Sequence, residues 1–256
     1  MPSPRLVAFD LDDTLAPSKH PIPPRIGELL VALAERVDVA IISGAQIEQF
    51  RTQVVEQLPD ASAETLSHID LLPTCGTQFY QLRRGGIDKL YAHELTADEK
   101  SQAITAVEQE ARRLGLWESR TWGDIIEDRG SQITFSALGQ HAPLAEKRAW
   151  DPTGEKKAAL RDAVAARLTG LEVRSGGSTS VDITHFGIDK AYGMNRLAEE
   201  TGIPLADMLF VGDRLDPGGN DYPVLAMGVA CHAVADWEET VTFLEELIPT
   251  LPLRAH

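Results

Sequence analysis

The chain has 256 residues, of which 43% are hydrophobic and 25% are charged, a composition that is typical of a globular protein with one or two domains. Its formal net charge of −15 opposes binding to nucleic acid, which depends on basic side chains that neutralise phosphates. No run of residues reaches the roughly 18 apolar positions of a membrane span, and no signal-peptide core is visible. The two distant cysteines, Cys75 and Cys231, predict reduced thiols, so we expect a cytoplasmic protein.

The first part of the chain alternates short apolar runs with helical patterns. Residues 6–9 and 39–42 predict buried parallel strands, and residues 26–34 place apolar side chains at helical spacing between them. A predicted helix at 45–58 and a predicted strand at 69–73 follow, and the pattern stops at Thr77. This order indicates the β-α-β units of a doubly wound parallel sheet.

The middle of the chain has a different order of elements. A helix begins at Thr96, with Glu99 three residues later as in a capping box, and another helix is predicted at 155–168. Predicted strands lie at 124–127, 132–137, 171–174 and 179–183. This order is typical of an α+β domain with an antiparallel sheet.

The parallel-sheet pattern returns near the C-terminus. We expect a helix at 190–200, strands at 208–211 and 229–234, and a last helix that begins at Asp236. The sequence therefore predicts an α/β fold, in which residues 1–90 and 187–256 form a doubly wound parallel-sheet core and residues 91–186 form an inserted α+β domain.

Acidic residues follow the first predicted strand directly. Asp10, Asp12 and Thr14 stand at the carboxyl end of that strand, where open α/β sheets bind ligands. Because residues two apart on an extended segment share a side, Asp10 and Asp12 can face one centre, where one attacks a phosphorus atom while the other handles protons. Adjacent acids in a loop also serve as helix caps or solvated charges, so this motif alone leaves both interpretations open.

Three further segments lie at the end of a predicted strand or at the start of the next helix. They are Ser43-Gly44, Lys190, and Gly212-Asp213 with Asn220-Asp221. A lone serine is usually a helix cap and a lone lysine is usually a solvated charge. In this order, however, the segments support one another as parts of a single site.

These four segments resemble the four motifs of the haloacid dehalogenase (HAD) superfamily. An insertion between the second and third motifs is similar to the type IIB cap, which implies a Rossmann-like core with an α+β cap domain. Within that subclass the chain resembles phosphomannomutases of the eukaryotic kind. This further likeness rests on residues 129–139, 176–182, 189–190 and 217–221.

The resemblance implies a role for each core residue. Asp10 would become an aspartyl phosphate, Asp12 would act as acid and base, Ser43 would bind phosphoryl oxygens and Lys190 would offset negative charge. Thr14 and Gly44 are expected substrate contacts. A Mg²⁺ cofactor would be held by Asp10, the main-chain carbonyl of Asp12, and Asp213, with support from Asn220 and Asp221, because this hard cation prefers oxygen ligands.

In the cap, the resemblance implies that Arg129, Ser180 and Asp182 contact the substrate. Two further expected contacts depart from the mutase pattern, since Gln140 and Lys147 stand where arginines would be expected. Glutamine is neutral and lysine lacks the planar fork of arginine, so a phosphate clamp in the cap would be weaker.

We therefore expect a Mg²⁺-dependent phosphatase that acts on a sugar phosphate or a similar small metabolite; the alternative is a phosphomannomutase-like phosphohexomutase. A catalytically inert sugar-phosphate-binding protein is disfavoured because nucleophile, metal ligand and lysine are all present. An oxidoreductase is disfavoured because acids occupy the turn where a pyrophosphate needs glycines. The resemblance also implies a homodimer formed through the cap. The identity of the substrate stays open.

Overall fold

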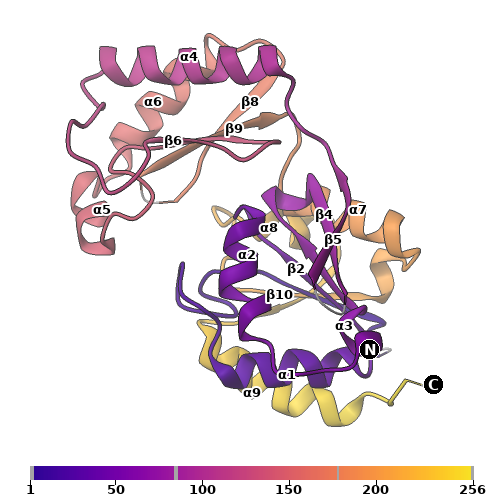
Figure 1. Cartoon of the computed structure of the whole chain (residues 1–256). Coiled ribbons are helices and arrows are strands. Elements are labelled where there is room, and N and C mark those ends of the chain that lie inside the picture. Colours follow the sequence, from indigo (N-terminus) through magenta and orange to yellow (C-terminus); the bar gives the residue numbers. More distant parts are fainter. Residues whose placement is uncertain (1–2, 84–85, 178, 255–256) are drawn as a thin grey trace. The chain divides into compact units, whose positions relative to one another are not determined.

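The computed structural model describes residues 3–83, 86–177 and 179–254, apart from the side chain of residue 144. Contacts divide the chain into two compact units, one of Met1–Ala92 with Ile188–His256 and the other of His93–Gly187 (Figure 1). These limits lie within two residues of the domain limits expected from the sequence.

The first unit is built on a seven-stranded sheet with the order β11-β10-β1-β2-β3-β4-β5. Five strands are parallel: β1 (Leu6–Phe9), β2 (Asp38–Ile42), β3 (Ile69–Leu72), β10 (Met208–Gly212) and β11 (Ala230–Ala233). The expected α/β fold with a parallel sheet is thus confirmed. The sheet is nevertheless mixed, because β4 (Gln78–Arg83) and β5 (Gly86–Ala92) continue it as an antiparallel hairpin.

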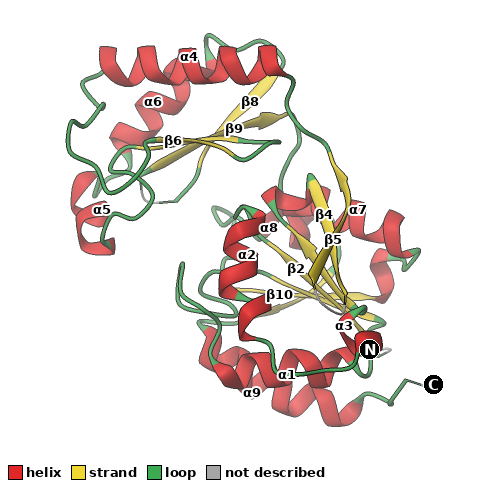
Figure 2. Cartoon of the chain, viewed as in Figure 1, coloured by secondary structure: helices red, strands yellow, loops and turns green. Residues whose placement is uncertain are grey.

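Helices cover both faces of this sheet (Figure 2). They are α1 (Pro24–Ala34), α2 (Ile47–Gln53), α3 (Ala63–Leu66), α7 (Lys190–Thr201), α8 (Tyr222–Ala226) and α9 (Trp237–Leu247), with short 3₁₀ turns at η1 (Val55–Gln57), η2 (Thr74–Gly76), η3 (Leu205–Asp207) and η4 (Ile248–Thr250). Because successive residues of a strand point to opposite faces, Val7 packs toward α1 and α9, while Ala8 packs toward α7.

The helix expected at 45–58 is shorter in the structure. It ends at Gln53, and η1 follows it. The break falls at Val54, whose φ of −115° departs from helical geometry. Two consecutive β-branched residues at this point also weaken the helix.

The second unit has a four-stranded antiparallel sheet with the order β6-β7-β9-β8. Its strands are β6 (Ile126–Asp128), β7 (Ile133–Ser136), β8 (Leu171–Ser175) and β9 (Ser180–His185), and its helices are α4 (Ala97–Arg113), α5 (Leu144–Trp150) and α6 (Glu155–Ala165). The predicted capping box of Thr96 and Glu99 opens α4. The helix expected at 155–168 ends three residues early.

Alternation along β7 and β9 gives this sheet one apolar and one polar face. Phe135, Val181 and Ile183 belong to the apolar cluster that includes residues of α4 and α6. The neighbouring positions Ser136 and Asp182 therefore point to the opposite face. In the part of the chain that the structure describes, no helix combines the length and apolar character of a membrane span.

An acidic side chain, Asp70, lies inside the first unit on β3. It is 3% exposed and accepts a hydrogen bond of 3.2 Å from Nε2 of Gln81. Burial raises the pKa of Asp70 from 3.8 to about 7, and the nearby charge of Asp38 adds to this shift. Since the folded state favours the protonated acid, the stability that this group contributes is present below pH 3.8 and is lost as the pH rises through about 7.

We predict that Asp70→Asn stabilises the protein at neutral and higher pH, because the amide stays uncharged where the carboxyl must ionise. The gain in the free energy of unfolding should be on the order of 1–3 kcal/mol near pH 8 and should shrink toward about pH 4. Urea unfolding at both pH values measures it, with exposed Asp60→Asn as the control. A gain that does not change with pH would refute the assignment.

Candidate active site

The site in the first unit forms where three neighbouring parallel strands end. Asp10 follows β1, Ser43 follows β2 and Asp213 follows β10, and β1 pairs with both of the other strands. The carboxyl ends of these strands meet at one edge of the sheet, so side chains distant in sequence come together there. Lys190 joins them from the first turn of α7.

Lys190 is the centre of a buried ionic group. Its Nζ lies 2.6 Å from Oδ1 of Asp10 and 2.5 Å from Oδ1 of Asp221, and all three side chains are almost fully buried. Burial alone disfavours the ammonium, but the charges of Asp10 and Asp221 outweigh it and raise the pKa of Lys190. The lysine is held there because Asp189 caps α7 by accepting a hydrogen bond from the amide of Tyr192.

The pKa of the Asp10 carboxyl depends on effects that oppose one another. Burial raises the pKa of its carboxyl, Lys190 lowers it and Asp221 raises it again, with a net upward shift. The amide of Leu11 also donates to Oδ1 of Asp10 at 2.7 Å. A cation close to this carboxylate would favour the ionised form that a nucleophile requires.

Three carboxylates at this edge fit a divalent cation. Asp10, Asp213 and Asp221 each offer an oxygen, and these oxygens lie within 4.8 Å of one another. The pKa of Asp213 is raised by burial and by the charge of Asp221, as expected where negative charges gather. A set of hard oxygen donors fits Mg²⁺. Asn220, which the sequence analysis placed near the metal, lies exposed in the loop before α8.

Asp221 depends on a glycine beside it. One of its oxygens contacts Lys190 and the other accepts a hydrogen bond of 3.0 Å from the amide of Arg214. A Cβ atom at Gly212 would overlap the Asp221 carboxylate. Glycine at the end of β10 is therefore required for Asp221 to reach Lys190.

The loop after β1 orients Asp12 and Thr14. Oδ1 of Asp12 accepts a hydrogen bond of 2.7 Å from the amide of Lys19. Burial raises the pKa of Asp12, although this hydrogen bond lowers it. Asp13, between them, adopts a left-handed φ of 65°. Thr14 is buried, and its hydroxyl lies 3.4 Å from Oδ1 of Asp213.

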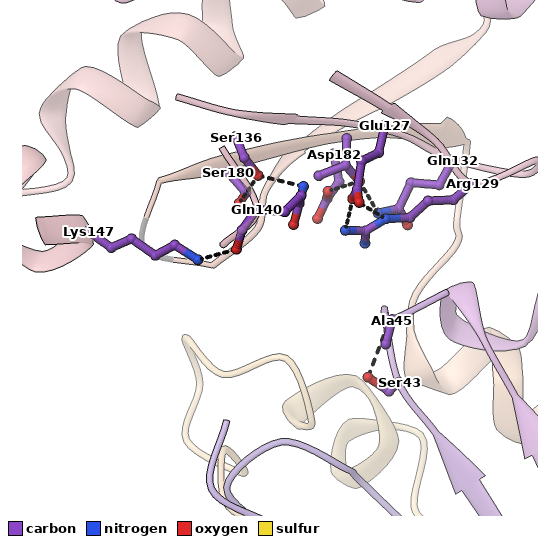
Figure 3. A network of polar contacts seen from close by, with 11 residues as sticks. Ser43, Ala45, Glu127, Arg129, Gln132, Ser136, Gln140, Lys147, Ser180 and Asp182 are labelled. Carbon is purple, nitrogen blue, oxygen red and sulfur yellow. Dashed lines mark hydrogen bonds and ion pairs between the residues drawn. The ribbon is translucent and has the colours of Figure 1, made fainter. Parts of the chain in front are cut away.

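A left-handed turn that the sequence analysis did not predict supports Ser43. Thr74, Cys75 and Gly76 all have positive φ, and the amides of Thr74 and Cys75 donate to the carbonyls of Ala45 and Ser43 at 3.0 and 2.9 Å. These bonds fix the backbone on both sides of half-buried Gly44. The Ser43 hydroxyl accepts a hydrogen bond from the Ala45 amide at 3.2 Å (Figure 3).

The same turn packs closely on α7. A Cβ atom at Gly193 would lie 2.9 Å from the carbonyl oxygen of Cys75, so glycine permits the approach. Lys190 stands one helical turn earlier on α7. The turn thus connects the Ser43 segment to the helix that carries the lysine. Gly76 was the one residue of this turn whose type favours positive φ. Thr74 and Cys75 rarely adopt positive φ, so the sequence did not predict a left-handed turn here.

The polar face of the second unit contains the residues expected in the cap (Figure 3). Oγ of Ser136 lies 3.1 Å from Oγ of Ser180 and accepts a hydrogen bond of 2.9 Å from Nε2 of Gln140. Nζ of Lys147 donates to the carbonyl of Gln140 at 3.0 Å. The structure thus brings Gln140, Lys147 and Ser180 together with Ser136, which the sequence analysis missed.

Asp182 and Arg129 lie on the same polar face. The hydroxyl of Thr134 donates to Oδ1 of Asp182 at 2.8 Å, and Arg129 forms an ion pair of 2.6 Å with Oε2 of Glu127. The alternation of polar residues along β6 and β7 could have revealed Glu127 and Thr134 as well. Position 178, inside the 176–182 motif, lies outside the described residues.

Known proteins resemble this chain along nearly all of its length. Mouse and human phosphomannomutase 1 are each 27% identical to it, with 98% of this chain and 94% of each relative covered. The phosphomannomutase of Saccharomyces cerevisiae is 24% identical, with 94% and 93% covered.

Solved structures show the same fold at low sequence identity. An IMP-nucleotidase of Plasmodium falciparum superposes with a TM-score of 0.70 at 14% identity, covering 96% of this chain and 70% of that one. A trehalose-6-phosphate phosphatase of Aspergillus fumigatus gives 0.54 at 18% identity, covering 96% and 93%. Residues 26–250 match the sequence model described as "Eukaryotic phosphomannomutase", and the chain therefore belongs to the eukaryotic phosphomannomutase family within the HAD superfamily.

Proposed function

We propose that the chain is a Mg²⁺-dependent phosphohexomutase that acts on a hexose phosphate through a phosphorylated Asp10. The observation that carries this proposal is the buried group in which Lys190 contacts Asp10 beside Asp213 and Asp221. Membership of the phosphomannomutase family supports the mutase reaction over the hydrolysis that the sequence alone favoured.

In the proposed reaction an oxygen of Asp10 attacks phosphorus in line. The bond from phosphorus to the sugar oxygen breaks, and Asp12 donates a proton to that oxygen. The raised pKa of Asp12 suits a proton donor. Asp12 then removes a proton from the acceptor hydroxyl, which attacks the aspartyl phosphate and releases Asp10.

The other core residues stabilise the charge that develops during transfer. Lys190 offsets the negative charge of Asp10, and the hydroxyl of Ser43 donates to a phosphoryl oxygen. A bound Mg²⁺ would supply positive charge that offsets the charge of the phosphoryl group. Asp213 and Asp221, together with Asp10, would hold the ion.

A second candidate, a phosphatase in which water is the acceptor, is favoured by one observation. The polar face of the second unit carries Arg129, Arg174 and Lys147 as cations, but Glu127, Glu172 and Asp182 are anions on the same face, and Gln140 is neutral. A mutase must hold the second phosphate of a bisphosphorylated sugar, which favours several bidentate arginines. This charge balance holds a second phosphate less well than a cluster of arginines would.

We predict that Asp10→Asn abolishes turnover while the protein stays folded, because an amide cannot form the acyl phosphate. Asp12→Asn should lower the rate by on the order of 10²–10⁴, the usual loss on removing an acid and base. Steady-state kinetics with circular dichroism tests both, with Asp13→Asn as the control from the same loop. Activity of Asp10→Asn above about a tenth of wild type would exclude this nucleophile.

Mg²⁺ should raise the melting temperature, because it binds the folded state and relieves repulsion among the three carboxylates. EDTA should abolish activity. Asp213→Asn should weaken the thermal shift, whereas Asp216→Asn, in the exposed loop nearby, should leave it intact. Differential scanning fluorimetry over a Mg²⁺ titration measures both effects, and equal shifts in the two variants would argue against Asp213 as a ligand.

The two candidate reactions differ in their products. Mannose 1-phosphate or glucose 1-phosphate, given with the corresponding 1,6-bisphosphate and Mg²⁺, should yield mainly the 6-phosphate, as phosphorus NMR can show. Gln140→Arg should raise the ratio of 6-phosphate to free phosphate, since an arginine strengthens the hold on the second phosphate. Free phosphate as the main product of the wild type would instead establish the phosphatase.

A further inference from the structure

A buried threonine on the last long helix contacts the catalytic loop. Thr240, on α9, is fully buried, and its hydroxyl donates a hydrogen bond of 2.7 Å to the carbonyl oxygen of Thr14. The two residues are 226 positions apart in the sequence. The Thr14 carbonyl is shielded from water, and this hydrogen bond gives it a partner, so that a buried acceptor is not left unsatisfied.

The loop that receives this bond closes partly on itself. The amide of Leu15 donates to the carbonyl of Leu11 at 2.9 Å, and the amide of Asp13 donates to the carbonyl of Ala16 at 2.7 Å. Thr240 adds a contact from outside the loop. It thereby ties the loop to a helix that packs on α1 and the sheet.

Thr14 is close to two carboxylates of the proposed site. The side-chain hydroxyl of Thr14 lies 3.4 Å from Oδ1 of Asp213, and Asp12 is two residues earlier in the same tight loop. A displacement of the Thr14 backbone would therefore move a neighbour of the metal ligand and the acid-base carboxylate together. Small displacements of catalytic groups have large effects on rate.

We propose that Thr240 is a positioning residue, whose hydroxyl holds the Thr14 carbonyl so that Asp12 and Asp213 keep their catalytic arrangement. This inference rests on the proposed function only in taking those two carboxylates as functional. The competing explanation is a hydrogen bond that stabilises the fold and leaves catalysis unchanged.

Two substitutions separate these explanations. Thr240→Val keeps the shape of the side chain but removes the donor, and it should lower kcat about tenfold and raise the Mg²⁺ concentration for half-maximal thermal shift several-fold. Thr240→Ser restores the hydroxyl and should recover both values to within about twofold. The matched control is Thr242→Val on the same helix, where the exposed hydroxyl donates to the Glu238 carbonyl of that helix.

Turnover of p-nitrophenyl phosphate and the Mg²⁺-dependent melting shift are measured well below each melting temperature. Thr240→Val with a lower melting temperature but wild-type kcat and Mg²⁺ midpoint would overturn the proposal, as would failure of Thr240→Ser to recover them. If Thr240→Val does not fold, Thr240→Ala is judged by the same two outcomes. Neither readout depends on hexose isomerisation. A wild-type protein that only hydrolyses sugar phosphates would therefore refute the mutase proposal, but the role of Thr240 could still be tested.

Discussion

The burial of Lys190 between Asp10 and Asp221 is the constraint on which the rest of the site depends. A buried ammonium is tolerated only where paired charges and hydrogen bonds replace water. Here one cation faces three carboxylates, because Asp213 lies beside the pair. The group therefore keeps surplus negative charge, which a divalent cation would offset. Burial is the main reason why the pKa values of Asp10 and Asp213 are raised, and the nearby charge of Asp221 adds to it.

Keeping these charges in contact requires unusual backbone at several points. Gly212 leaves room for the Asp221 carboxylate, and Gly193 lets the left-handed turn of η2 approach α7. Positive φ at non-glycine residues costs free energy and persists only where surrounding contacts enforce it. At Thr74 and Cys75, hydrogen bonds to the Ser43 segment provide that enforcement. The strained residues of this turn are thus the ones that hold the backbone around Ser43 in place.

The parallel strands and the residues at their ends were predictable because buried strands are continuous apolar runs and ligand sites follow them. The β4–β5 hairpin was missed because its edge strand is half exposed and carries charges, so it lacks that signal. Contacts such as Ser136 with Ser180, or Thr240 with Thr14, join residues far apart in the sequence and depend on tertiary packing. No local pattern in the sequence encodes them, and this is why the support of the site was less predictable than its chemistry.

In the proposed function, the core and the inserted unit have different roles in the reaction. In the proposed mechanism the carboxylates and Lys190 determine that phosphate passes through Asp10, whichever acceptor follows. In the same proposal the acceptor depends on how long a sugar bisphosphate is retained, and hence on the charges of the second unit. There Glu127 already pairs with Arg129, Glu172 pairs with Arg174, and the Gln140 carbonyl accepts from Lys147, so these cations would have to share their donors with an incoming phosphate. In this proposal a guanidinium at position 140 would add donors for the second phosphate, so we expect this position to influence the balance between transfer to sugar and transfer to water.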